Sequence, residues 1–256
     1  EAVNAILDFY YNRNSENLLH RFEKLRNDYN NHASDFPTDE VFAMNFYYAY
    51  YISVIGKFSD AQQLFTDLIV RFPVFFRQSP HIIYRYCILL AVSGNLDEMK
   101  NVLESQLKKY FQSFDNDARA ITCVAYSVYY MLTNETEMAY HFMNKFREVI
   151  NKKSMLSYEI SMRIFEIILY YQRADEKFSV QQLKRFMRYI KDRSSSVAAF
   201  PNLILLVNNL NLLLNNLIDK KISISEFETE INNSLPGNQA VLGRLIINAA
   251  HIRNQS

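Results

Sequence analysis

Short polar elbows recur at intervals of about 40 residues along this chain. They are centred on Asn14, Gly56, Gly94, Asn134 and Asp175, with a looser one near Lys220. The stretches between elbows carry apolar residues at helical spacing. A regular period of this length is typical of repeat proteins in which each unit is one supersecondary structure. The spacing therefore predicts consecutive antiparallel helical hairpins.

Each predicted hairpin has a leading helix before its elbow and a second helix after it. The leading helices before the middle four elbows are rich in aromatic residues and span 39–55, 79–93, 116–132 and 155–172. The second helices after the first five elbows are more charged and span 15–31, 58–71, 95–111, 134–151 and 179–192. Gly and Asn at the elbows suit the left-handed backbone that ends many helices.

Composition favours helices over a turn-rich β fold, because 49% of the residues are hydrophobic and only four are Gly and five Pro. We expect an all-α fold in which residues 1–256 form a single domain, with hairpin repeats over 1–193 and a divergent C-terminal repeat and cap over 194–256. The net charge is +1, so no overall field selects nucleic acid or an acidic substrate. Two cysteines make no disulfide framework, and we expect a cytoplasmic protein.

One stretch carries a more specific pattern, formed by Gly56, Phe58, Ala61, Phe65, Leu68 and Pro73. It resembles the second half of a tetratricopeptide unit, well over residues 42–75 and loosely over 79–192. Small residues match the family where its helices touch, at Ala49, Cys87, Ser127, Ala61 and Ala139. The resemblance implies a right-handed superhelix of about six hairpins that binds other chains. Asn45 at the family's Trp position, Met99 and the longer period depart from the pattern, so HEAT-like or divergent hairpins remain alternatives.

The same resemblance implies that the leading helices line a concave groove. The groove positions that we expect to contact a ligand are Phe46, Tyr50, His81, Tyr84, Ile88, Val124 and Val128. They are apolar and aromatic, whereas the family members that clamp a C-terminal carboxylate use Lys, Arg and Asn at several of these places. This surface favours an apolar peptide or a helix of a partner protein. The alternative is that these side chains pack against neighbouring helices.

An uncharged segment over residues 194–218 is long enough to test for a membrane span. Six of its Asn residues fall on one half of a helical wheel, so we expect an amphipathic packed helix and no membrane span. Asn208, Asn211 and Asn215 share a face and suit an extended peptide backbone. In this the chain resembles the sensor domains of peptide-pheromone receptors of Gram-positive bacteria. That similarity implies an alternative function, the sensing half of a transcription regulator whose DNA-binding domain is absent from this chain. A solvated face is the other interpretation.

No catalytic motif is legible in the chain. The five histidines form no metal-binding pair, and four glycines cannot supply a phosphate-binding loop. We therefore expect no catalytic residues, no metal and no cofactor, with an enzyme built from remote residues as a second alternative. The basic residues over 184–193 are interpreted as a solvated helix face, so nucleic acid is not the expected partner.

The C-terminal region predicts two further helices. Ser225 and Glu228 have the spacing of a capping box, which opens a short helix running to about Leu235. The last helix, over 239–253, carries an apolar stripe of Leu242, Leu245, Ile246 and Ala249. The stripe either caps the stack or pairs with a second copy in a homodimer. Taken together, the sequence predicts a non-catalytic module that binds a peptide or a partner protein.

Overall fold

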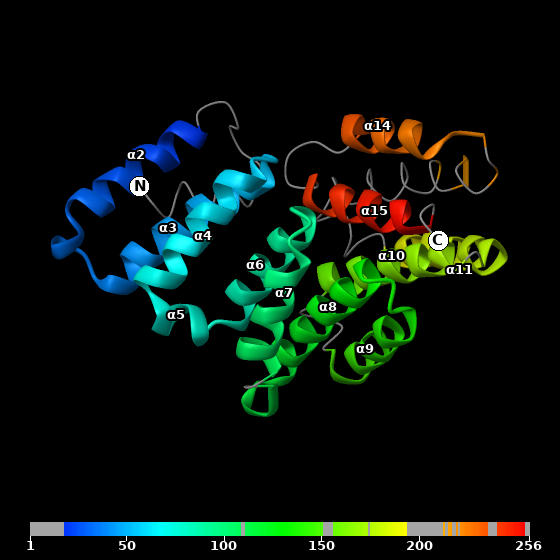
Figure 1. Ribbon diagram of the computed structural model, residues 1–256, viewed down its shortest axis with the longest axis horizontal. Helices are drawn as coiled ribbons and strands as arrows, with labels where there is room; N and C mark the ends of the chain where they lie inside the picture. The colour runs from blue at the N-terminus through cyan, green and yellow to red at the C-terminus, as the bar shows by residue number, and fades with distance from the viewer. Residues whose placement is uncertain are drawn as a thin grey trace.

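The computed structural model describes residues 18–108, 111–150, 156–173, 175–193, 221–234 and 240–253, together with residues 212, 215, 216 and 219 (Figure 1). The described residues form helices and turns and contain no strand. The expected all-α fold is therefore confirmed for these residues. The expected elbow at Asn14 and most of the Asn-rich segment lie outside them.

Four complete hairpins follow one another along the chain. Their leading and second helices are α3 (Thr38–Val54) with α4 (Phe58–Arg71), α6 (Pro80–Val92) with α7 (Leu96–Val102), α8 (Asn116–Leu132) with α9 (Thr136–Val149), and α10 (Leu156–Gln172) with α11 (Glu176–Asp192). The flanking helices are α2 (Leu18–Asn31), the short α5 (Pro73–Arg77), α14 (Ile224–Ser234) and α15 (Ala240–Arg253). Short 3-10 turns span Ala33–Asp35 and Phe111–Ser113. The helices of each hairpin pack together, and each second helix also contacts the leading helix that follows it.

Left-handed residues end the leading helices, as the elbows predict. Gly56, Gly94 and Asn134 have φ angles of 84°, 73° and 62°. At each elbow the left-handed residue donates its N–H to the carbonyl three residues earlier, and the next residue donates to the carbonyl five residues earlier, with N···O distances of 2.8–3.4 Å. These paired bonds satisfy carbonyls that a helix end leaves without partners.

The hairpins share one packing register, counted from the residue that caps each second helix. Four residues after the cap, the side chains of the four hairpins are fully buried: Ala61, Met99, Ala139 and Ser179. In the fourth hairpin the Ser179 hydroxyl donates to the Ile167 carbonyl of the leading helix, at 3.2 Å. Ile167 is the counterpart of Ala49, Cys87 and Ser127, which are also fully buried. The positions predicted to carry small residues where paired helices touch are thus buried, and the larger Met99 and Ile167 are buried at the equivalent positions of the second and fourth hairpins.

A π-helical turn departs from the predicted helix 95–111. It spans Leu103–Lys108, directly after α7. Eleven residues after the cap, the other hairpins place an apolar side chain in the core, but the same count here gives Gln106. The π turn adds a residue, so that Leu107 is fully buried and Gln106 is half-buried. The wide turn therefore keeps an apolar side chain in the core.

Asn45 joins α2 to α3 through a buried polar network. Asn45 and Asn30 exchange amide hydrogen bonds of 3.0 and 3.2 Å. The Asn45 carbonyl oxygen also accepts from Arg26 Nε at 3.1 Å, and its amide donates to the Val41 carbonyl at 2.8 Å. Each polar atom of this buried side chain has a partner, which offsets the cost of its desolvation.

The capping box of α14 lies two residues earlier than predicted. The Ser223 N–H and hydroxyl both donate to Glu226 Oε2, at 2.7 and 2.9 Å, and the Glu226 N–H donates to Ser223 Oγ at 3.2 Å. The predicted pair of Ser225 and Glu228 has the same spacing and is wrong. Capping at Ser223 places Ile222 and the fully buried Phe227 at the two positions of a hydrophobic staple, which lie before the N-cap and in the first turn of the helix. Only in this register are both positions apolar.

Candidate functional site

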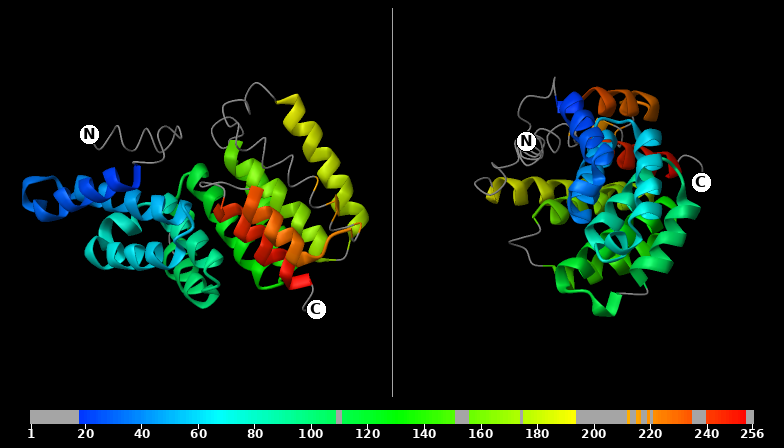
Figure 2. Two further views of the ribbon diagram at one scale, coloured as in Figure 1. Left: turned by 90° about the horizontal axis from the view of Figure 1, so that it is seen from above. Right: turned by 90° about the vertical axis from the view of Figure 1, so that its left-hand side faces the viewer.

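The C-terminal helix α15 lies across the leading helices. It contacts α3, α6, α8 and α10, and α14 packs against it as well. In Figure 1, α15 lies between α14 on one side and α10 on the other, and in the left panel of Figure 2 it overlies green leading helices. We call the face of α3, α6, α8 and α10 that α15 contacts the wall. The predicted groove is built from these leading helices.

Apolar side chains hold α15 in place. Leu245, Ile246 and Ile247 are consecutive and all buried, at 2%, 0% and 1% exposure. Three neighbouring positions span most of a helix circumference, so the helix is enclosed on more than one side. Leu245 and Ile246 belong to the predicted apolar stripe, and their burial confirms that part of it. The side chains of Leu242 and Ala249 lie outside the described set.

The polar contacts of α15 divide between the wall and α14. The Asn248 amide donates to the Ala91 carbonyl on α6 at 3.3 Å. On the same face of the helix, Glu228 of α14 pairs with Arg244 Nη1 at 2.9 Å and with His251 Nε2 at 3.1 Å. The Ala91 carbonyl oxygen also accepts a hydrogen bond from the Gly94 N–H of the elbow. The Asn248 amide therefore donates to the second lone pair of that oxygen.

The predicted groove residues differ in their burial. Val124 and Val128 are fully buried, and Ile88 and Phe46 are buried at 7% and 8% exposure. Tyr50 and Tyr84 are half-buried and His81 is exposed. Asn215 is half-buried, whereas Asn208 and Asn211 lie outside the described residues. The apolar positions on α8 are interior, whereas Tyr50 on α3 and Tyr84 on α6 are half-buried.

The half-buried Tyr50 and Tyr84 lie in a cluster, here named the ring cluster, together with Tyr158, Arg85 and the buried Phe46. The Arg85 guanidinium lies 3.7 Å from the centroid of the Tyr50 ring, which is within cation–π range. Tyr84 on α6 meets Tyr158 on α10 edge-on, with centroids 5.5 Å apart. Burial, followed by the neighbouring Tyr158, raises the pKa of Tyr84, so its hydroxyl stays protonated and can donate.

Sequence reasoning had not assigned Tyr158 or Arg85 to the site. Tyr158 stands three residues before Ser161, which is the counterpart of His81 in the fourth hairpin. Tyr158 could be found by extending the pattern of groove positions to the fourth leading helix and then one helical turn towards its start. Arg85 lies next to the predicted Tyr84 but points to α3 and the Tyr50 ring.

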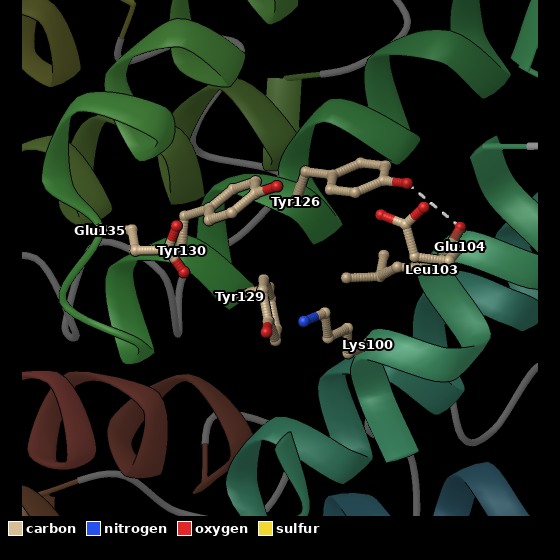
Figure 3. A pocket seen from close by; sticks show the side chains of 7 residues that line it. All are labelled: Lys100, Leu103, Glu104, Tyr126, Tyr129, Tyr130 and Glu135. Carbon is tan, nitrogen blue, oxygen red and sulfur yellow. Dashed lines mark hydrogen bonds between the residues drawn. The ribbon is translucent and has the colours of Figure 1, made fainter. Parts of the chain in front are cut away.

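A small pocket lies between the π turn and α8, with a volume of about 110 Å³ (Figure 3). It is lined by Lys100, Leu103, Glu104, Tyr126, Tyr129, Tyr130 and Glu135. The Tyr126 hydroxyl donates to the Leu103 carbonyl at 3.1 Å. Burial, and then the Glu104 charge, raises the pKa of Tyr126, so the phenol does not serve as a base. Ligand sites usually enclose ~300 Å³ or more, so this pocket suits water better than a substrate.

A buried carboxylate, Glu159 of α10, organises the outer end of the last hairpin. It accepts hydrogen bonds from Tyr189 at 2.6 Å and Arg163 at 3.0 Å, and Arg193 lies at 3.7 Å. Burial alone raises the pKa of this carboxyl, but the hydrogen bonds and the two guanidinium charges outweigh it, and the pKa falls below 4.5. Burial and the bond to Glu159 raise the pKa of Tyr189 to about 12. This network fixes α11 on α10.

The described residues hold no group of three or more His, Cys, Asp and Glu side chains arranged to bind a metal. Cys87 and Cys123 are buried, and burial raises the pKa of both thiols, that of Cys123 to about 12. Both therefore remain unreactive thiols at neutral pH. Within the same part of the chain, every helix is too short or too polar to cross a lipid bilayer.

Comparison with protein-family models, with curated proteins and with solved structures finds no match to this chain. The candidate site is therefore defined by geometry alone, as the wall, the ring cluster at its edge and the helix α15 that covers it.

Proposed function

We propose that this protein is a non-catalytic binding module that holds a peptide or a helix of a partner protein against the wall. The observation that carries the proposal is that the wall already holds a helix. Helix α15 contacts the wall and carries buried apolar side chains, and an elbow carbonyl of the wall accepts a hydrogen bond from the Asn248 amide. Helix-in-groove recognition relies on the same combination of apolar anchors and a few placed polar groups.

We interpret the stacked hairpins as a tetratricopeptide-like right-handed superhelix with the wall on its concave side. The interpretation is supported by the left-handed elbow residues and by the common packing register of the four hairpins. Repeat proteins of this kind act through an extended inner surface.

The ring cluster is the part of the wall that we propose a partner reaches first. Tyr50 and Tyr84 are half-buried there, whereas Val124 and Val128 are fully buried. A tyrosine offers a large ring and a hydroxyl at little entropic cost, which is why it is frequent at binding interfaces. No observation on the described residues favours the regulator or the enzyme alternative over this module.

The test begins with mass spectrometry of peptides retained on the purified protein, followed by anisotropy titration of an identified peptide. The double variant Tyr50→Ala with Tyr84→Ala should weaken binding by about tenfold or more while far-ultraviolet circular dichroism stays unchanged. The matched Tyr50→Phe with Tyr84→Phe variant keeps the rings and should retain most of the affinity. Equal loss of binding and of helicity in the Ala variant would mean that the rings serve the core.

A further inference from the structure

We propose that α15 is a built-in competitor, and that the partner of the wall is an amphipathic helix that resembles α15 and takes its place. This inference rests on the proposed function and names its partner class. The partner helix would present a broad aliphatic face, as Leu245, Ile246 and Ile247 do, followed by a carboxamide at the position of Asn248.

The elbow carbonyls provide the polar part of this recognition. The Ala91 carbonyl ends α6 and accepts from both the Gly94 N–H and the Asn248 amide. The Met131 carbonyl is its counterpart on α8, and it accepts from the Asn134 N–H and from the Gln172 amide at 3.4 Å. Two hairpins thus present the same carbonyl to a side-chain amide from another helix. A partner with Asn or Gln at this position satisfies the same geometry.

The side-chain contacts between α15 and α14 do not hold α15 to the wall. Arg244 and His251 both pair with Glu228 on α14, the helix that precedes α15 in the chain. Movement of α14 and α15 as one hairpin therefore keeps these pairs intact. When α15 leaves, the wall loses its apolar contacts with α15 and the hydrogen bond from Asn248. Because apolar contacts are non-directional, a second amphipathic helix can replace those made by α15.

The covalent link between α15 and the rest of the chain explains why α15 occupies the wall in the absence of a partner. Burying three aliphatic side chains supports an affinity in roughly the millimolar to micromolar range for a free helix. A helix in the same chain acts at an effective concentration on the order of millimolar. A free helix of equal quality at micromolar concentration is therefore outcompeted by about a thousandfold. Weakening α15 should lower that barrier.

The experiment uses the full chain and a fluorescein-labelled peptide with the sequence of α15, residues 240–253. Anisotropy titrations compare the wild type, Ile246→Ala and Val70→Ala. Val70 is 75% exposed on α4, so its substitution removes aliphatic atoms without touching the wall. Ile246→Ala in the chain should tighten peptide binding by about 30-fold or more, because truncating a buried Ile loosens α15 by at least this factor. Val70→Ala should bind the peptide as the wild type does.

A less destabilising substitution separates release of α15 from unfolding of the whole protein. Ile246→Val should tighten peptide binding by a few-fold, in keeping with the smaller cost of removing one methylene. A peptide carrying the same Ile246→Ala change should bind at least tenfold more weakly to every chain. A lowered melting temperature in Ile246→Val and Ile246→Ala without tighter peptide binding would overturn the inference, since α15 would then be a fixed core helix.

Two results separate this inference from the proposed function. Equal peptide affinity for the wild type and for Ile246→Ala overturns the competitor role while leaving the wall as a binding surface. Absence of binding to every folded variant counts against both. Size-exclusion chromatography with light scattering is run alongside. A dimer that dissociates when the peptide binds would overturn the inference in favour of α15 exchange between two copies of this chain.

Discussion

The side-chain amide of Asn248 donates to the backbone carbonyl of Ala91 at 3.3 Å, across 157 residues of sequence. The bond links the last helix to the elbow of the second complete hairpin. It fixes where along the wall α15 sits, because apolar contacts alone permit a helix to slide or rotate. Position along the wall, in turn, decides which of the leading-helix residues are covered.

Removing this bond should destabilise the protein moderately. Asn248→Ala is expected to lower the free energy of unfolding by about 1 kcal/mol, because the Ala91 carbonyl keeps its elbow partner. Asn248→Asp should cost more, since its carboxylate faces a carbonyl oxygen and cannot donate. Urea denaturation measures both. Equal stability of wild type and Asn248→Asp would show that this contact does not form in solution.

The network of Asn45 should matter more. Asn45→Ala leaves the Arg26 and Asn30 donors without this partner, and we expect a loss of about 2 kcal/mol in the free energy of unfolding. Asn31→Ala serves as the control, because Asn31 is exposed on the same helix as Asn30. Its effect should stay within about 0.5 kcal/mol. A cost for Asn45→Ala no larger than that of the control would mean that the network contributes nothing to stability.

The elbow geometry predicts a ranking of substitutions at Gly94. Its φ is +73°, and a Cβ built there meets no atom within 4 Å, so strain and not crowding sets the cost. Gly94→Ala should lower stability by about 1–2 kcal/mol. Gly94→Asn should cost less, as Asn134 occupies the same conformation at the next elbow. Thermal unfolding gives the order, and a smaller effect for Ala than for Asn would contradict the left-handed assignment.

Much of this fold could be predicted because its signals are local. Helical periodicity and the left-handed Gly and Asn residues gave helix ends within a few residues of those observed. The place of α15 could not be predicted, because an apolar stripe fits a cap, a dimer and a wall equally well. Ser223 with Glu226 and Ser225 with Glu228 share one spacing, and burial of Phe227 is the tertiary fact that separates them.

Part of the candidate site could also be predicted, because its signals are local. Tyr50 and Tyr84 follow from the register of a single helix, whereas the contact between Tyr84 and Tyr158 joins hairpins two and four and depends on how the stack curves. The sequence also carries a sign of the π turn. Counting eleven residues from the cap places polar Gln106 where the other hairpins bury an apolar residue.

Stability at acidic pH should depend on Glu159. Its folded-state pKa is lowered, so its contribution is fully present above the ordinary value of 4.5 and is lost as the pH falls from there through the folded-state pKa. Glu159→Gln should be less stable than wild type at pH 7 and should lose less stability between pH 6 and about pH 3. Denaturation curves across this range measure the difference. Parallel pH profiles for the two proteins would contradict the assigned shift.

The most direct test of the account asks what Asn248 touches in solution. Replacing Asn248 with a photoreactive amino acid, irradiating the monomeric protein and mapping the cross-link by mass spectrometry reports the neighbour of α15. The account predicts an intramolecular cross-link to the end of α6, in the peptide that contains Ala91. A cross-link to a second copy of the chain, or to a segment away from the leading helices, would contradict it.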